Sequence, residues 1–287
     1  MYNAIDTCAK VEFDINRLRT QENLSWNEIC RTKIIPENII REYQHKFDWQ
    51  DICRYQKLSD NFMREYKDEI CWHTVCMNQI LSENFIIEFQ NRVDWKEVSR
   101  YQMLSEDFMR KYQDKICWYG VSMKQFLSEN FIIEFQDLVD WKDISHSQIL
   151  SEKFITEFKN KVFWKEITKM QCLSEQFIYE FKDKVDWNLI SRYQILSEDF
   201  IGEFQHDVCW HGICKTQSLS EGFLREYQNQ ISWSEVSYYQ ALSENFIKDF
   251  QHDVDWKNII NKQCLSENFI VKFEDKWYDY ECDYDNF

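Results

Sequence analysis

Two short segments of the chain combine cysteine and histidine at a spacing that could bind a metal ion. The candidate ligands are Cys71, His73 and Cys76 in the first segment and Cys209, His211 and Cys214, with His206 close by, in the second. Thiolate and imidazole groups are the usual ligands of structural zinc. Other parts of the chain, however, carry Asp at the outer cysteine position and Ser or Thr at the inner one. We therefore interpret these cysteines as ordinary replacements of small or polar residues and predict no metal and no cofactor.

Patterns typical of enzymes are missing from the sequence. It contains no Gly-rich phosphate loop, no Ser/His/Asp grouping and no His-Glu-x-x-His segment, and its four glycines are scattered at positions 120, 202, 212 and 222. Such glycines cannot form a nucleotide cradle. We expect a protein without catalytic activity.

The elements that position these side chains are set by a repeat of tryptophan. Trp recurs every 23 residues from Trp26 to Trp256, which defines eleven repeats. We number positions from each Trp, so that +7 is the seventh residue after it. Position +3 is Ile or Val in most repeats, +7 is Gln in ten and +9 is Leu in ten. Repeats of this length are typical of solenoids, in which stacking of neighbours supplies the core.

Each repeat is predicted to form two short helices. A Ser-Glu-x-Phe-Ile-x-Glu-Phe segment, as in 82–89, begins with a Ser suited to cap a helix and places apolar residues on one helical face. A second helix begins at Trp, after an Asp such as Asp94 that has capping-box character with Glu97. The sequence thus predicts an all-α fold, an α-solenoid of about eleven helix-turn-helix repeats that is superhelical and elongated.

The recurring polar residues are interpreted as scaffold. Stacked Gln side chains at +7 could bond one another or the free carbonyl groups at helix ends, which would satisfy buried polar groups. Cys30, Cys53 and Cys76 share one position in adjacent repeats, but a stacking distance near ~10 Å exceeds what a disulfide allows. We predict free thiols.

Composition sets the class of protein. The chain has 287 residues, 34 Lys and Arg against 50 Asp and Glu, a net charge of −16, 4 Gly and 1 Pro. Few turn residues argue against β folds, and the acidic balance argues against a nucleic-acid partner.

No apolar stretch reaches the ~18 residues of a membrane span. Eleven cysteines without a secretory signal at the start favour a reducing compartment rather than secretion.

Positions that vary between repeats are the candidates for partner binding. In a solenoid the recurring positions hold the stack and the varying outward ones are free to contact partners. Position +5 is often basic, which predicts a partly basic strip on an acidic protein. A solvated face with internal ion pairs is the alternative interpretation. The candidate partner-binding residues are Arg54, Arg100, Lys169, Arg192 and Lys215.

The repeat unit resembles that of a known group of proteins. Leu196 to Phe204, read with the Lys-Val-Asp-Trp of 184–187, is similar to short tandem repeats in proteins of giant DNA viruses of amoebae, the marseillevirus-like group in particular. The resemblance spans roughly residues 30–273. It implies a viral origin and a location in the host cytoplasm or the virus particle, and it carries over no functional residue.

The sequence gives three segments. Residues 1–25 are expected to form an N-terminal cap, 26–278 one solenoid of repeats, and 279–287 an acidic and aromatic C-terminal tail or cap. The expected function is a noncatalytic scaffold for protein–protein interaction in the infected host or the virus particle. A nucleic-acid-binding solenoid that uses the basic strip is the alternative, and a structural zinc protein is a weaker one.

Overall fold

The computed structural model describes residues 25–276 together with Thr20. Over 25–276 short α-helices follow one another at the predicted period, and this part of the chain contains no strand. The all-α fold and its organisation as an α-solenoid of 23-residue repeats are confirmed. The predicted caps at 1–25 and 279–287 lie outside the described residues, apart from Thr20 and Ser25.

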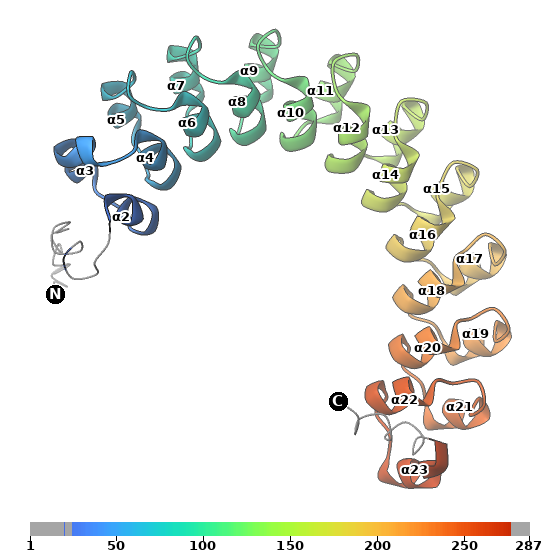
Figure 1. Ribbon diagram of the computed structural model, residues 1–287. Coiled ribbons are helices and arrows are strands. Elements are labelled where there is room, and N and C mark those ends of the chain that lie inside the picture. The colour runs from blue at the N-terminus through green and yellow to red at the C-terminus, as the bar shows by residue number, and fades with distance from the viewer. Residues whose placement is uncertain (1–19, 21–24, 277–287) are drawn as a thin grey trace, which may run out of the picture. The chain divides into compact units, whose positions relative to one another are not determined.

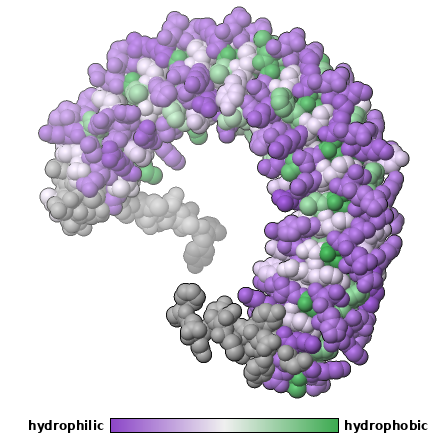
Figure 2. Space-filling model, turned by 45° about the vertical axis from the view of Figure 1, so that its right-hand side comes forward, coloured by the Kyte–Doolittle hydropathy of each residue, from purple (hydrophilic) through white to green (hydrophobic). Residues whose placement is uncertain are grey.

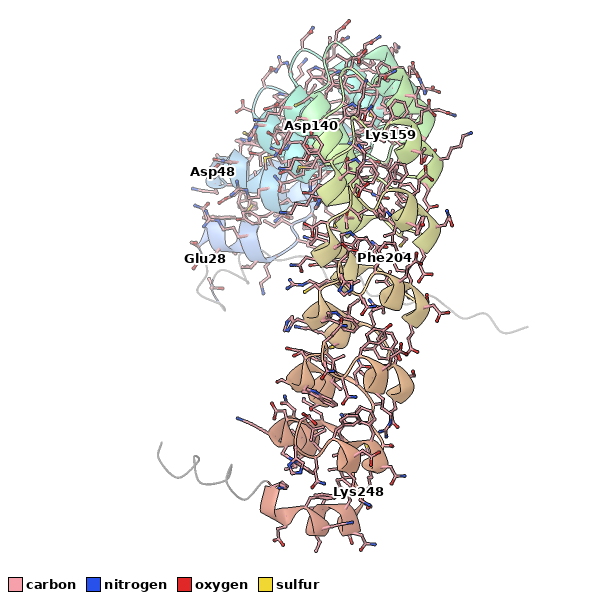
Figure 3. The ribbon with its side chains drawn as sticks, turned by 90° about the vertical axis from the view of Figure 1, so that its right-hand side faces the viewer. Glu28, Asp48, Asp140, Lys159, Phe204 and Lys248 are labelled. Carbon is pink, nitrogen blue, oxygen red and sulfur yellow. The ribbon has the colours of Figure 1, made fainter. Side chains whose placement is uncertain are left out.

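The helices group into two compact units, which we call unit 1 (residues up to 148) and unit 2 (residues from 149). Within each unit, the helices that begin at Trp lie along one side, and the helices that follow the Ser position lie along the other (Figure 1). We call them Trp helices and Ser helices. In Figure 3, Asp48 and Asp140 mark the ends of Trp helices in unit 1, and Lys248 lies on a Ser helix of unit 2.

The helix bounds follow the repeat closely. The Trp helices of unit 1 are α2 (Trp26–Thr32), α4 (Trp49–Tyr55), α6 (Trp72–Asn78), α8 (Trp95–Tyr101), α10 (Trp118–Lys124) and α12 (Trp141–Ser147). Its Ser helices are α3 (Glu37–Tyr43), α5 (Asp60–Glu65), α7 (Glu83–Glu88), α9 (Glu106–Lys111) and α11 (Glu129–Glu134), with a short 3-10 turn, η1 (Gln44–Lys46), after α3.

Unit 2 continues the same alternation. Its Trp helices are α14 (Trp164–Met170), α16 (Trp187–Tyr193), α18 (Trp210–Thr216), α20 (Trp233–Tyr239) and α22 (Trp256–Lys262). Its Ser helices are α13 (Glu152–Glu157), α15 (Glu175–Glu180), α17 (Glu198–Glu203), α19 (Glu221–Glu226) and α21 (Glu244–Asp249), and α23 (Glu267–Lys272) is followed by η2 (Glu274–Lys276). None of the described helices has the length and apolar character needed to cross a membrane.

Caps and packing hold these helices, which are too short to be stable alone. The hydroxyl of Ser82 accepts a hydrogen bond from the backbone N–H of Phe85, as predicted, and the same bond recurs in the Ser helices after α3. Helix α3 begins after Pro36 and lacks a side-chain cap. Asp94 caps α8 by accepting from the N–H groups of Lys96 and Glu97. The Ser helices are shorter than the apolar pattern suggested, because α7 ends at Glu88 and Val93 lies beyond it in a turn.

The core lies between the two rows of helices. In the third repeat, for example, Val75, Leu81, Phe85, Ile86 and Val93 are all buried. The Trp side chains are only half-buried in most repeats, although a residue that recurs at a fixed position of a solenoid is expected in its core. The Trp72 ring lies against Phe85 and Phe89 of the same repeat, with ring centroids 6.1 and 4.9 Å apart. Its indole N–H donates to the Lys67 carbonyl at 3.0 Å.

The Gln residues at +7 join each repeat to the one before it, and we call this row the Gln ladder. Gln102 is buried, and its amide nitrogen donates to the carbonyl oxygens of Cys76 and Gln79 at 2.7 and 2.8 Å. Its amide oxygen accepts from the N–H of Leu81 at 2.8 Å. Of the two arrangements considered from the sequence, the structure shows the bonds to free helix-end carbonyls. The Gln side chain therefore caps the carboxyl end of the Trp helix in the preceding repeat.

Candidate partner-binding surface

The five predicted partner-binding residues lie in the last turn of five Trp helices. Arg54 is on α4 and Arg100 on α8 in unit 1, and Lys169, Arg192 and Lys215 are on α14, α16 and α18 in unit 2. The structure thus brings the three residues of unit 2 onto consecutive Trp helices, whereas α6 with Met77 separates Arg54 from Arg100. A cation here also complements the negative end of the helix dipole, which is a structural reason for basic residues.

These five side chains form no ion pair with the described residues. Basic residues on the Ser helices behave differently, because Arg41, Arg64 and Arg110 each contact a carboxylate of the next repeat at 2.8 to 2.9 Å. Basic residues of the Ser helices therefore take part in internal ion pairs. On the Trp side Arg31 at +5 also pairs with Asp51, at 2.9 Å, whereas the five candidate residues form no such pair with the described residues.

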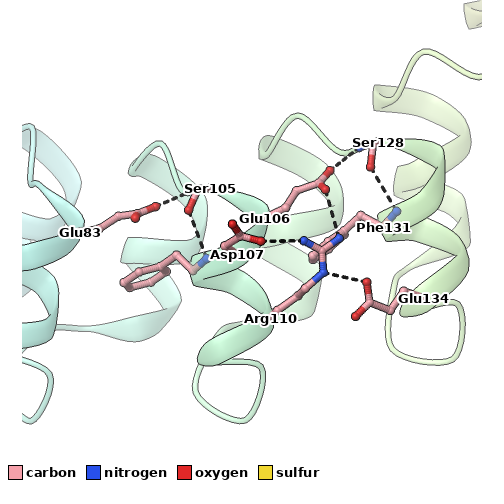
Figure 4. A network of polar contacts seen from close by, with 9 residues as sticks. Glu83, Ser105, Glu106, Asp107, Arg110, Ser128, Phe131 and Glu134 are labelled. Carbon is pink, nitrogen blue, oxygen red and sulfur yellow. Dashed lines mark hydrogen bonds and ion pairs between the residues drawn. The ribbon is translucent and has the colours of Figure 1, made fainter.

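Figure 4 shows one network of charged side chains on the Ser helices. The Arg110 guanidinium contacts Glu106, Asp107 and Glu134. Glu106 also accepts from the backbone N–H of Ser128 at 2.7 Å, and Glu83 accepts likewise from Ser105. Burial alone would raise the pKa of Glu106, but hydrogen bonds from Ser128 and the Arg110 charge outweigh it and hold that pKa below its ordinary value. Sequence reasoning treated this Glu only as a charge near a helix end and missed its bond to the next repeat.

Tyrosine side chains accompany the basic residues. Position +6 holds Tyr in several repeats, and the Lys169 ammonium lies 5.8 Å from the ring of Tyr193 in the next repeat. Lys215 lies 5.4 Å from Tyr239 in the same way. These contacts show that positions +5 and +6 share one surface.

Two glycines let arginine stems lie across the next repeat. A Cβ atom at Gly120 would come within 2.8 Å of the Arg100 Cγ, and one at Gly212 within 3.1 Å of the Arg192 Cγ. The absence of a side chain at these two positions therefore makes room for the Arg stems. Arg100 is half-buried as a result, and Arg192 stays exposed.

An apolar row at position +8 is the feature that sequence reasoning missed. Ile80 is 96% exposed and Phe126 is 90% exposed, although both are large apolar residues. The signal was present, because +8 is apolar in most repeats although it falls in a connection between helices. The apolar row consists of Ile34, Ile80, Met103 and Phe126 in unit 1 and of Ile149 and Ile195 in unit 2. Hydrophobic side chains also recur singly on the largely hydrophilic surface seen in Figure 2.

A shallow groove shows how these positions combine within unit 2. It has a volume of about 490 Å³ and is lined by Tyr238, Tyr239 and Ala241 of one repeat and by Lys262 and Cys264 of the next. The Lys262 ammonium lies 4.4 Å from the Tyr238 ring. In these two repeats, residues at positions +5, +6 and +8 thus line one surface that contains aromatic and basic groups. We call positions +5, +6 and +8 of the repeats, taken within each unit, the Trp-side strip.

The cysteines of the two candidate metal segments do not converge on their histidines. Cys76 is buried, and burial raises the pKa of its thiol to about 11. Cys214 is also buried, and burial likewise raises the pKa of its thiol to about 11. Both take the place of a buried Ser such as Ser99, whose hydroxyl bonds the Trp95 carbonyl. Cys30 and Cys53 are likewise free and buried, as predicted.

Comparison with known proteins adds no relative. No protein-family model, no curated protein and no solved structure matches this chain.

Proposed function

We propose that the chain is a noncatalytic scaffold that binds a partner protein along the Trp-side strip. The observation that carries the proposal is the apolar row, in which side chains such as Ile80 and Phe126 stand almost fully in water at one position of successive repeats. A contiguous exposed apolar surface marks an interaction site, and the apolar row places exposed apolar side chains at one position of adjacent repeats from Ile80 to Ile149. The setting expected from the repeat signature, an infected host cell or a virus particle, is part of the proposal.

The chemistry of the strip indicates the kind of partner. Basic groups that lack internal ion pairs lie beside the apolar row, so an acidic segment with apolar side chains complements both. An extended segment can follow one surface over several repeats, as partners of solenoids do. The proposal therefore concerns an acidic and apolar stretch of a protein rather than a small molecule.

The test is affinity capture from amoebal extract and from virus particles with three forms of the chain. The strip variant changes Ile80→Ser, Met103→Ser, Phe126→Ser, Lys169→Glu, Arg192→Glu and Lys215→Glu. The control variant changes Lys153→Glu, Lys159→Glu and Lys248→Glu, three exposed residues on the Ser side, of which Figure 3 labels the last two. We expect the control to recover the same proteins as the wild type and the strip variant to lose them.

Three results would contradict the proposal. Equal capture by all three forms would place the partner elsewhere. Recovery of RNA or DNA that disappears with added salt would favour the nucleic-acid alternative. Hydrolytic turnover of a substrate would show an enzyme.

A further inference from the structure

A histidine and two carboxylates from adjacent repeats meet in unit 1. His73 is the second residue of α6, Asp94 is the cap of α8 and Glu97 is the third residue of α8. Their candidate ligand atoms lie within 4.8 Å of one another. The Nδ1 atom of His73 and Oδ2 of Asp94 are 2.9 Å apart. This group differs from the Cys and His segment considered from the sequence, since it uses neither Cys71 nor Cys76.

Glu97 is the member that a histidine–aspartate pair does not explain. It is 6% exposed, and its carboxylate forms no hydrogen bond or ion pair with any described residue. Asp51 holds the same position two repeats earlier and is also buried, but Arg31 neutralises it at 2.9 Å. The position therefore has a cation in one repeat and lacks one in the other.

Asp94 is already oriented for a ligand on the His73 side. Its Oδ1 atom accepts hydrogen bonds from the N–H groups of Lys96 and Glu97, which fixes the carboxylate and directs Oδ2 toward His73.

We propose that His73, Asp94 and Glu97 bind one divalent transition-metal ion, with Zn²⁺ as the best match. Imidazole nitrogen together with carboxylate oxygen is a donor set that zinc accepts, whereas Mg²⁺ and Ca²⁺ prefer oxygen alone. Zinc bonds of about 2.0–2.2 Å require the widest pair of donors to close by about 1–1.5 Å. The His73 side chain is 57% exposed, so water borders it on its outer side. The remaining positions of the ion face solvent, so water completes the coordination.

Such an ion would join two neighbouring repeats. His73 belongs to α6 and both carboxylates belong to α8, so the ion would add a link between the repeats in parallel with the Gln ladder. A ligand that binds only the folded chain raises its stability. We therefore expect zinc to raise the melting temperature of the wild-type chain.

The molecule contains its own matched control. His211 in unit 2 holds the same position as His73, and its Nδ1 atom lies 3.3 Å from Glu235 of the next repeat. The third donor is missing there, because Ser232 replaces the Asp. Two donors are a weaker site than three, so this junction should not retain zinc at the concentration that fills the first one.

The experiment titrates the full-length chain, freed of metal, with ZnCl2 by calorimetry and follows cobalt absorption in parallel. We expect one tight equivalent in the wild type, loss of that equivalent in His73→Ala, and at least tenfold weaker binding in Glu97→Gln. The variant His211→Ala should bind like the wild type, and Ser232→Asp should gain a second equivalent. The cobalt spectrum should lack a thiolate charge-transfer band.

Three outcomes would overturn the proposal. The wild type could fail to bind zinc, which would leave His73 and Asp94 as a plain ion pair. Binding could be the same in His73→Ala as in the wild type. A thiolate band retained in that variant would assign the ion to cysteine. Circular dichroism of each variant checks that it is folded.

Discussion

Gln79 and Ile80 are neighbours in the chain but lie in opposite environments. The polar Gln79 is 7% exposed, whereas the apolar Ile80 is 96% exposed. The burial of Gln79 is balanced because its amide bonds two carbonyl groups and one N–H of the preceding repeat. No such compensation within the described residues accounts for Ile80. The contrast separates a position that serves the stack from one that, in the function proposed above, contacts a partner.

The Gln ladder should therefore give the largest loss of stability. Gln125→Leu removes the bonds to the carbonyls of Ser99 and Gln102 and to the N–H of Leu104, and leaves all three buried groups without a partner. We expect a loss of about 3–5 kcal/mol, since each unsatisfied group costs about 1–3 kcal/mol. Urea unfolding of the full chain measures the loss. Lys124→Ala, one residue away, is the control, and an equal effect of both changes would show that the amide is dispensable.

The exposure of Trp118 is intermediate between that of the buried Gln79 and the exposed Ile80, because its ring is half-buried. The ring packs 4.8 Å from Phe135, and its indole N–H donates to the Gln113 carbonyl at 3.2 Å. We expect Trp118→Ala to cost about 2–4 kcal/mol, at or below the usual range for a buried Trp. Unfolding by urea measures it, and a change under ~0.5 kcal/mol would show that the aromatic stack contributes little.

Asp143 contrasts with the Gln ladder, because its buried Oδ2 atom has no hydrogen-bond partner among the residues that the structure describes. Burial, followed by the charge of Asp140, raises the pKa of Asp143. A raised pKa in the folded state means that the protonated form is favoured there, so its contribution to stability is present at low pH and is lost as pH rises.

We therefore expect Asp143→Asn to raise the melting temperature at pH 7, and the difference from the wild type to shrink toward pH 4. Scanning calorimetry across this range measures both. An Asn variant that is less stable than the wild type at pH 7 would indicate an ionised carboxylate that is well stabilised.

The apolar row should show the smallest effect on folding. We expect Phe126→Ser to change the free energy of unfolding by less than about 0.5 kcal/mol, because surface substitutions rarely do more. Urea unfolding measures the change. A loss above ~1 kcal/mol would mean that Phe126 contributes to the stack, and it would remove the main support for the Trp-side strip.

Much of the fold could be predicted from the sequence, because the Trp spacing and the Ser capping positions are local signals. The end of a Ser helix could not, since the backbone of Phe89 leaves the helical conformation at φ −109° and ψ 27°, although Val93 still fits a helical pattern. The bonding of the Gln ladder could not be predicted either, because bonds between Gln side chains and bonds to helix-end carbonyls both fit the sequence. The choice between the two arrangements depends on how adjacent repeats are shifted relative to each other. That shift is a property of the stack and cannot be read from one repeat.

The candidate surface was predicted in part. The basic residues at +5 were found because they vary between repeats, but the apolar row escaped notice because an apolar residue is ordinarily assigned to the core. The group around His73 was missed for another reason. His73 and Asp94 are 21 residues apart in the chain. The metal segments indicated by the sequence contain only residues that are close neighbours in the chain.

The spacing of the Gln ladder bears on how such a chain can evolve. Gln102, like most of these Gln residues, bonds residues 21, 23 and 26 positions before it. Duplicating or deleting a block of 23 residues by unequal recombination restores all three spacings at the new junction, whereas inserting a single residue breaks them. Selection on the ladder therefore permits changes in the number of repeats while it suppresses every other change of length. The chain can gain or lose exposed surface in whole steps of one repeat.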